Sequence, residues 1–177
     1  MKNPVTFIPD KTRKTILLAL ITWTLFLTII FQVINVPLQT SDAPAGIVSF
    51  ELAGTDANAR VMVASWDSRA QLFAAFSLGL DYLYMPSYAF TIALASLMAA
   101  GRHPGRFSKI GTWLGWGVFL AAIFDAIENL GLWKSLVDQI DTVWPGISYW
   151  CAILKFTLIF LGIVYSLIGW ILPKKNV

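Results

Sequence analysis

The sequence predicts an all-α fold, a bundle of four transmembrane helices, and three observations lead to it. Of the 177 residues, 57% are hydrophobic and 13% are charged, and the mean hydropathy is +0.68. The charged residues fall mostly between long apolar runs. Four of these runs are long enough to cross a hydrocarbon core of about 30 Å, which takes about 20 helical residues. This composition excludes intrinsic disorder and argues against a water-soluble enzyme.

Each apolar run predicts one membrane-spanning helix of a single integral membrane domain over residues 1–177. The expected spans are residues 15–36, 69–100, 109–133 and 147–172. The second run is the longest, roughly 48 Å at the helical rise, so we expect it to tilt, kink or project beyond the hydrocarbon core. Pro86 lies inside this run and is the expected site of a kink.

Basic residues flank the spans unevenly, and their distribution predicts the orientation. The side that holds both termini has nine: Lys2, Lys11, Arg13, Lys14, Arg102, Arg106, Lys109, Lys174 and Lys175. The other side has three: Arg60, Arg69 and Lys134. Because cytoplasmic loops carry the excess of Lys and Arg, both termini are expected on the cytoplasmic side. Tryptophans expected at the two membrane interfaces are Trp113, Trp116 and Trp170 on the inner side and Trp133, Trp144 and Trp150 on the outer side.

The first span has an alternative interpretation as a cleaved signal peptide. Basic residues precede it, and the small residues Ala43 and Ala45 follow it in an A-x-A arrangement. Its apolar stretch of about 22 residues is longer than the 7 to 15 of a signal sequence. The length therefore favours an uncleaved helix.

The segment between the first two spans, residues 37–68, is the expected outer loop, and its pattern predicts partial order. Apolar residues at 48, 50 and 52 alternate with Ser49 and Glu51, which predicts a short extended segment. Two alternatives remain open for Glu51, which either dips into the mouth of the bundle or is solvated. The residues expected to start or face the helices that follow are Thr55 or Asp56, Val61, Met62, Trp66, Asp67 and Ser68.

Four ionisable residues lie inside the predicted spans: Asp81, Asp125, Glu128 and Lys155. Each costs about 2.5 to 3.5 kcal/mol at the centre of a span, so the side chains are expected to face one another rather than lipid. Counting from the centres of their spans, all four fall in the outer half of the membrane.

Helical spacing predicts which polar side chains share a face. Asp125, Glu128 and Asn129 form one stripe of the third span. The other predicted polar stripes are Ser77, Asp81, Tyr84 and Tyr88, and Ser148, Cys151 and Lys155. Small residues expected to let helices approach closely are Gly111 with Gly115, Gly117 with Ala121, and Ala75 with Gly79.

Three acids and one base in the spans sum to −2 if all are ionised. This total is unfavourable in a low-dielectric interior, so we expect at least one carboxyl to be protonated near pH 7, or a cation to be bound. Asp125 and Glu128 are one turn apart and should titrate as a coupled pair. Glu128 is the expected partner of Lys155.

Catalytic signatures are largely missing from the sequence. Residues 77–81 place leucines where the G-x-G-D motif of intramembrane aspartyl proteases has glycines. No nucleophile-elbow, zinc-protease, Walker or Rossmann motif occurs. His103 is interpreted as a solvated loop residue and Cys151 as a small packing side chain. No catalytic residue is assigned and no cofactor is expected.

Four short strings resemble a family of small bacterial four-helix integral membrane proteins with no known activity. They are FELAG at residues 50–54, GLDYLY at 79–84, DAIEN at 125–129 and LKF at 154–156. The resemblance covers most of the chain and implies a bacterial inner membrane architecture without a function.

The favoured hypothesis is an integral membrane protein that binds a cation, a proton or the polar part of a lipid-like ligand, in a role related to transport. The predicted ligand-binding residues are Asp81, Asp125, Glu128, Asn129 and Lys155, with Tyr84 and Glu51 as further contributors. A structural or assembly subunit and a lipid-modifying enzyme remain as alternatives. Expected partners are the bilayer and a second copy or another membrane protein, and not nucleic acid, because no basic stripe is interleaved with aromatic residues.

Overall fold

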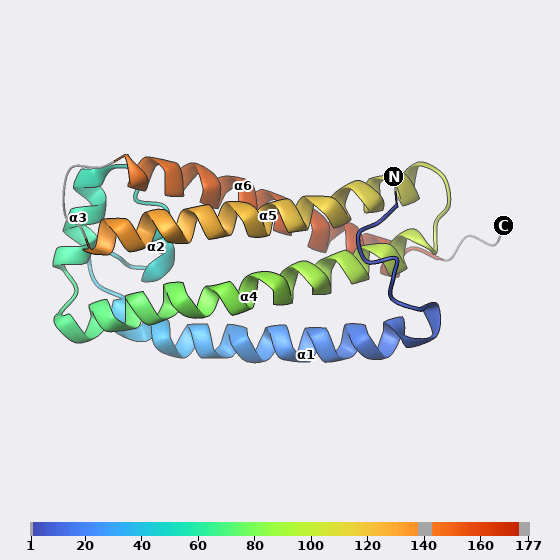
Figure 1. Cartoon of the computed structure of the whole chain (residues 1–177), viewed down its shortest axis with the longest axis horizontal. Coiled ribbons are helices and arrows are strands. Elements are labelled where there is room, and N and C mark those ends of the chain that lie inside the picture. The colour runs from blue at the N-terminus through green and yellow to red at the C-terminus, as the bar shows by residue number, and fades with distance from the viewer. Residues whose placement is uncertain (1, 138–142, 174–177) are drawn as a thin grey trace. The chain divides into compact units, whose positions relative to one another are not determined.

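The computed structural model describes residues 2–137 and 143–173, and in this part of the chain all regular structure is helical (Figure 1). The long helices are α1 (Asp10–Asn35), α4 (Ser68–Ala100), α5 (Arg106–Val137) and α6 (Trp144–Ile171). The short ones are the 3-10 helix η1 (Val36–Leu38), α2 (Ile47–Glu51) and α3 (Asp56–Ala64). No strand occurs within the described ranges. The bases Lys174 and Lys175 lie outside them.

The four long helices confirm the four apolar spans that the sequence predicts. Each is long and apolar enough to cross a membrane, with peak mean hydropathies from 1.4 to 2.3. Their bounds extend a few residues beyond most of the predicted limits, because polar and basic residues continue the helices past the apolar runs. Pro86 lies inside α4, which continues through it as one helix. The single bundle and the kink stay predictions.

The chain divides into two compact units, and each long helix contributes to both. Unit 1 contains Met1–Leu25, Pro86–Ile123 and Lys155–Val177. Unit 2 contains Phe26–Met85 and Phe124–Leu154. The two units are described separately below.

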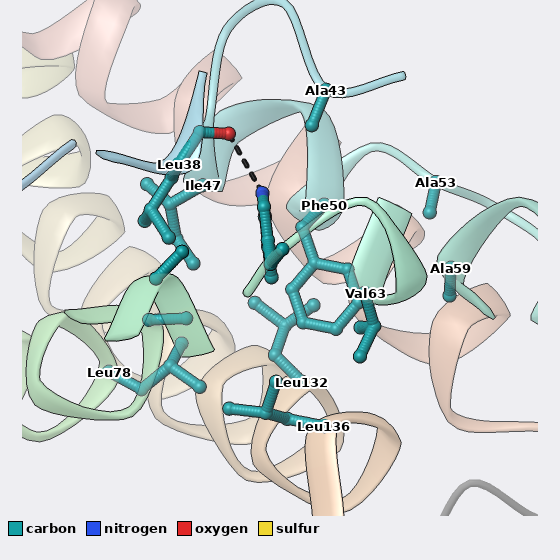
Figure 2. Close-up of a cluster of buried hydrophobic side chains, with 13 residues drawn as sticks. Leu38, Ala43, Ile47, Phe50, Ala53, Ala59, Val63, Leu78, Leu132 and Leu136 are labelled. Atoms are coloured by element: carbon teal, nitrogen blue, oxygen red, sulfur yellow. Dashed lines mark hydrogen bonds between the residues drawn. The ribbon is translucent and has the colours of Figure 1, made fainter. Parts of the chain in front are cut away.

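Unit 2 is built around a buried cluster that joins the segment between α1 and α4 to the long helices (Figure 2). The side chains of Phe50, Val63 and Leu132 belong to this cluster, so α2, α3 and α5 share one core. The Trp66 indole packs edge-on against Phe50 and donates a hydrogen bond to the Leu38 carbonyl oxygen at 2.8 Å. The segment between the spans therefore packs on the helices, as the sequence predicts.

Polar side chains fix the N-terminal ends of two helices in unit 2, α3 and α4. The Thr55 hydroxyl accepts a hydrogen bond from the Asn58 amide and starts α3. The Asp67 carboxylate accepts one from the Ala70 amide and starts α4. Both are N-caps of the kind the sequence predicts.

The predicted extended segment at residues 48–52 is wrong, because residues 47–51 form helix α2. Ile47, Phe50 and Glu51 are buried with helical spacing, whereas Val48 is exposed. Asn35 holds the start of α2, since its side-chain oxygen accepts from the Ile47 amide at 2.8 Å. A side chain at Gly46, where φ is +63°, would clash with Asn35.

Unit 1 contains hydrogen bonds between neighbouring long helices. The hydroxyl oxygens of Ser96 in α4 and Ser166 in α6 lie 3.0 Å apart and share a hydrogen bond. The Trp23 indole of α1 donates to the Ser87 hydroxyl of α4 at 3.1 Å. These bonds satisfy polar groups of helices that are otherwise apolar.

His103 is buried, so its interpretation as a solvated loop residue is wrong. Its side chain is 5% exposed, and Nε2 lies 3.0 Å from the Gly169 carbonyl oxygen near the end of α6. The imidazole also packs edge-on against Phe107. The loop between α4 and α5 thus folds back onto α6 through a side chain whose partner is distant in sequence.

Close approaches at glycines occur at only some of the predicted positions. A Cβ at Gly117 would lie 3.3 Å from a methyl group of Leu158, whereas one at Gly79 would meet nothing within 4 Å. Gly79 is therefore not a close-packing site, contrary to the prediction. Gly162 of α6, which the sequence analysis missed, is one: a Cβ there would lie 2.6 Å from a methyl group of Ile92 and 3.0 Å from one of Val118.

We expect Gly162→Ala to lower the free energy of unfolding by about 1 to 3 kcal/mol, because the added methyl group overpacks unit 1. Gly79→Ala is the matched control, since it adds the same methyl group to another helix in open space and favours the helix by up to about 1 kcal/mol. Titration with sodium dodecyl sulfate in mixed micelles measures both. Equal stability of the two variants would contradict the close approach at Gly162.

Candidate functional site

The seven predicted ligand-binding residues are distributed over four helices. They are Glu51 on α2, Asp81 and Tyr84 on α4, Asp125, Glu128 and Asn129 on α5, and Lys155 on α6. All except Lys155 belong to unit 2. The geometry described here is therefore that of unit 2.

Helix α5 carries a polar stripe that is almost completely buried. Asp125, Glu128 and Asn129 are 2%, 0% and 2% exposed. The residues on the opposite side of the same turns are apolar and exposed, among them Ile127 and Leu130. This arrangement is the reverse of a helix on the surface of a water-soluble protein and is the one expected when the exterior is lipid.

Asn129 joins α5 to α4 through its side-chain amide. Its Nδ2 donates to the Asp81 carboxylate oxygen Oδ2 at 2.7 Å and to the Leu78 carbonyl oxygen at 3.5 Å. Asp81 is half-buried. The predicted meeting of polar groups from the second and third spans is thus present at this pair.

Glu128 lies where α6 comes closest to α5. The Ser148 hydroxyl of α6 donates to the Glu128 backbone carbonyl oxygen at 3.1 Å, and both residues are fully buried. The approach requires Gly131, because a Cβ there would clash with the Ser148 hydroxyl. The Glu128 carboxyl oxygen Oε2 is buried in this close-packed region.

Glu51 is buried, with 8% of its surface exposed, so the solvated alternative for this residue is wrong. Glu51 follows Phe50 in α2. Both residues are buried, because α2 packs against the core of unit 2. The membership of Glu51 in one site with the α5 carboxyls stays a prediction.

Tyr84 links α4 to α1. Its hydroxyl oxygen lies 3.0 Å from the Thr28 hydroxyl, and its ring packs edge-on against Phe31 at 5.2 Å between centroids. Thr28 was not among the predicted polar residues, although a threonine in the middle of an apolar span indicates a polar contact between helices.

Lys155 is buried and belongs to unit 1, where its Nζ atom lies 4.8 Å from the centre of the Phe156 ring. Its pairing with Glu128 stays a prediction. Cys151 of unit 2 is buried, in line with its interpretation as a packing side chain.

The described residues offer no group of three or more His, Cys, Asp or Glu side chains that could hold a metal ion. A scan of protein-family models and searches of curated proteins and of solved structures find no match to the chain. The resemblance carried by the four strings therefore stays a prediction, and the chemistry of the buried residues has to support any function.

We expect the Asp81 and Asn129 side chains to be energetically coupled. Asp81→Leu should lower the free energy of unfolding by about 1.5 to 3 kcal/mol, because it removes the acceptor and leaves the buried amide of Asn129 with one bond fewer. Asp81→Asn is the matched control, since its side-chain oxygen can still accept from Asn129.

A double-mutant cycle with Asn129→Leu measures the coupling, which is expected to be about 0.5 to 3 kcal/mol. Additive losses in Asp81→Leu, Asn129→Leu and the double variant would show that the bond contributes nothing to stability.

Proposed function

We propose that the chain is an integral membrane protein of four spans in one bundle, with both termini in the cytoplasm. The nine basic residues on the side of the termini, against three on the other side, support this orientation. Most tryptophans predicted at the interfaces are exposed, which supports contact with lipid headgroups: Trp113, Trp116, Trp133, Trp150 and Trp170.

The proposed function is reversible binding of a proton by the carboxyl groups buried in unit 2. One observation carries it. Among the described residues, the buried acids are Glu51, Asp125 and Glu128, and the one buried Lys or Arg is Lys155. Three negative charges and one positive charge leave −2 if all are ionised, whatever the pairing.

A net charge buried out of water costs several kcal/mol per ion, and a proton on a carboxyl removes that cost. A proton is favoured over a metal ion, because a metal needs several ligands and the described residues contain no such group. The buried carboxyl groups of Asp125 and Glu128, one turn apart on α5, are the proposed binding locus.

A structural role is the second candidate, and the Asn129 to Asp81 hydrogen bond favours it. Polar contacts between membrane helices contribute about 0.6 to 2 kcal/mol each. The Asn129 to Asp81 bond by itself therefore explains neither the excess of buried carboxyl groups nor the burial of Glu128. The two candidates differ in one observable, the presence of a protonated carboxyl at neutral pH.

We expect the purified protein at pH 7 to show the infrared C=O band of a protonated carboxyl, and Glu128→Gln or Asp125→Asn to diminish it, because these side chains belong to the buried acidic set. Asp42→Asn is the matched control, since Asp42 is acidic and exposed. Difference spectra in ¹H₂O and ²H₂O identify the band. A wild-type spectrum without this band at pH 7 would reject proton binding and favour the structural role.

A further inference from the structure

Unit 2 contains a second feature that the acidic residues do not explain, an open pocket between α3, α4 and α5. Its volume is about 320 Å³, and it is lined by Arg60, Val63, Ala64, Gln71 and Ser135. This volume is at the lower end of the range of small-molecule pockets. Two of the lining residues, Val63 and Ala64, are apolar, and the other three are polar or charged.

Two of the polar groups that line the pocket can act as hydrogen-bond acceptors. Gln71 Nε2 donates to the carbonyl oxygens of Val63 at 3.3 Å and Trp66 at 3.2 Å. Because carbonyl oxygens only accept, the amide orientation is fixed and its Oε1 is the atom that Gln71 can offer to a ligand. The Ser135 hydroxyl donates to the Gly131 carbonyl oxygen at 2.9 Å, which leaves its oxygen as an acceptor.

The third polar group, Arg60, supplies positive charge. Its side chain is 41% exposed, and its Nε forms an ion pair with Asp56 one turn earlier in α3. This ion pair orients the guanidinium, a planar fork of N–H donors whose geometry suits phosphate oxygens. The pocket therefore combines a cation for a phosphate with acceptors for a group that carries N–H donors.

The pocket lies at the ends of long apolar helices. Gln71 is in the first turn of α4 (Ser68–Ala100), and Ser135 is in the last turn of α5 (Arg106–Val137). The 33 residues of α4 span about 50 Å, against a hydrocarbon core of about 30 Å, so both ends of the helix reach the headgroup level. Leu72 and Phe76, which follow Gln71 on α4 and are 71% and 56% exposed, begin an apolar stripe suited to acyl chains.

We propose that this pocket binds the headgroup of a phospholipid that carries both a phosphate and a primary ammonium group. The phosphate contacts the Arg60 guanidinium, and the ammonium donates to Gln71 Oε1 and the Ser135 hydroxyl oxygen. The inference rests on the membrane insertion proposed above but not on proton binding. The carboxyl band of the wild type, recorded on the same preparations, tests proton binding separately. Failure of lipid binding and failure of proton binding can therefore be told apart.

Lipid titrations of the full chain in detergent micelles, followed by native mass spectrometry, test the proposal. The ligands are phosphatidylethanolamine and phosphatidylcholine with identical acyl chains, and soluble glycerophosphoethanolamine. We expect the choline lipid to bind about fivefold more weakly, because its quaternary nitrogen has no N–H to donate and one net hydrogen bond is lost.

Ala64→Leu is the blocking variant, since it fills the pocket without removing a hydrogen bond. Ala57→Leu is its matched control, because Ala57 is an exposed alanine of the same helix and does not line the pocket. Ala64→Leu should weaken binding of the ethanolamine lipid at least about fivefold, and Ala57→Leu should leave it unchanged. Ser135→Ala should reduce the preference for ethanolamine over choline while the fold is kept.

Three results would overturn the proposal. Binding unchanged in Ala64→Leu would place the lipid elsewhere. Equal affinities for the two lipids, in the wild type and in Ser135→Ala, would remove the role of the acceptors. Equal affinities for glycerophosphoethanolamine and the lipid would assign the pocket to a soluble phosphate ester.

Discussion

In the proposed membrane setting the hydrocarbon around the long helices offers no hydrogen-bond partners, and this constraint accounts for where their polar side chains lie. Several polar side chains of the long helices have their hydrogen-bond partner on a neighbouring helix. The pairs between long helices include Thr28 with Tyr84 and Asn129 with Asp81 in unit 2, and Trp23 with Ser87 and Ser96 with Ser166 in unit 1. The faces left outside are apolar. A helix such as α5, apolar outside and acidic inside, has the pattern expected where the exterior is lipid, which supports the proposed membrane insertion.

The segment between α1 and α4 is held by the opposite principle, since its apolar side chains are buried in a hydrophobic core that it shares with α4 and α5. Phe50 and Trp66 pack together and against the ends of α4 and α5, which fixes α2 and α3. That packing has two consequences for polar chemistry. It takes the Glu51 carboxyl inside, and it brings Arg60 beside Gln71 and Ser135. Apolar packing of α2 and α3 thus determines where these two charged groups lie.

Signals that act over one helix were predictable from the sequence, and those that depend on packing between segments were not. Apolar runs of 20 or more residues predict the long helices. Thr55 and Asp67 are predictable as N-caps of α3 and α4, because the amide that each side chain accepts from lies three residues away. Three alternating residues are too few to separate a strand from the single turn of α2. The burial of His103 depends on Gly169, 66 residues away. The pocket depends on α3, α4 and α5 together, and no local pattern encodes it.

The three basic residues of the proposed outer side differ in their surroundings, and of these three Arg60 is the one that lines the pocket. Arg69 lies over the Phe73 ring at 5.8 Å, and Lys134 lies over the Trp144 ring at 5.6 Å. Both side chains therefore form cation–π contacts with aromatic rings. Lys134 is also in the last turn of α5, where a positive charge stabilises the helix end. Arg60 is held by Asp56 along one edge of its guanidinium and lines the pocket. An ion pair at one edge leaves the planar group oriented, and orientation is what a phosphate contact requires.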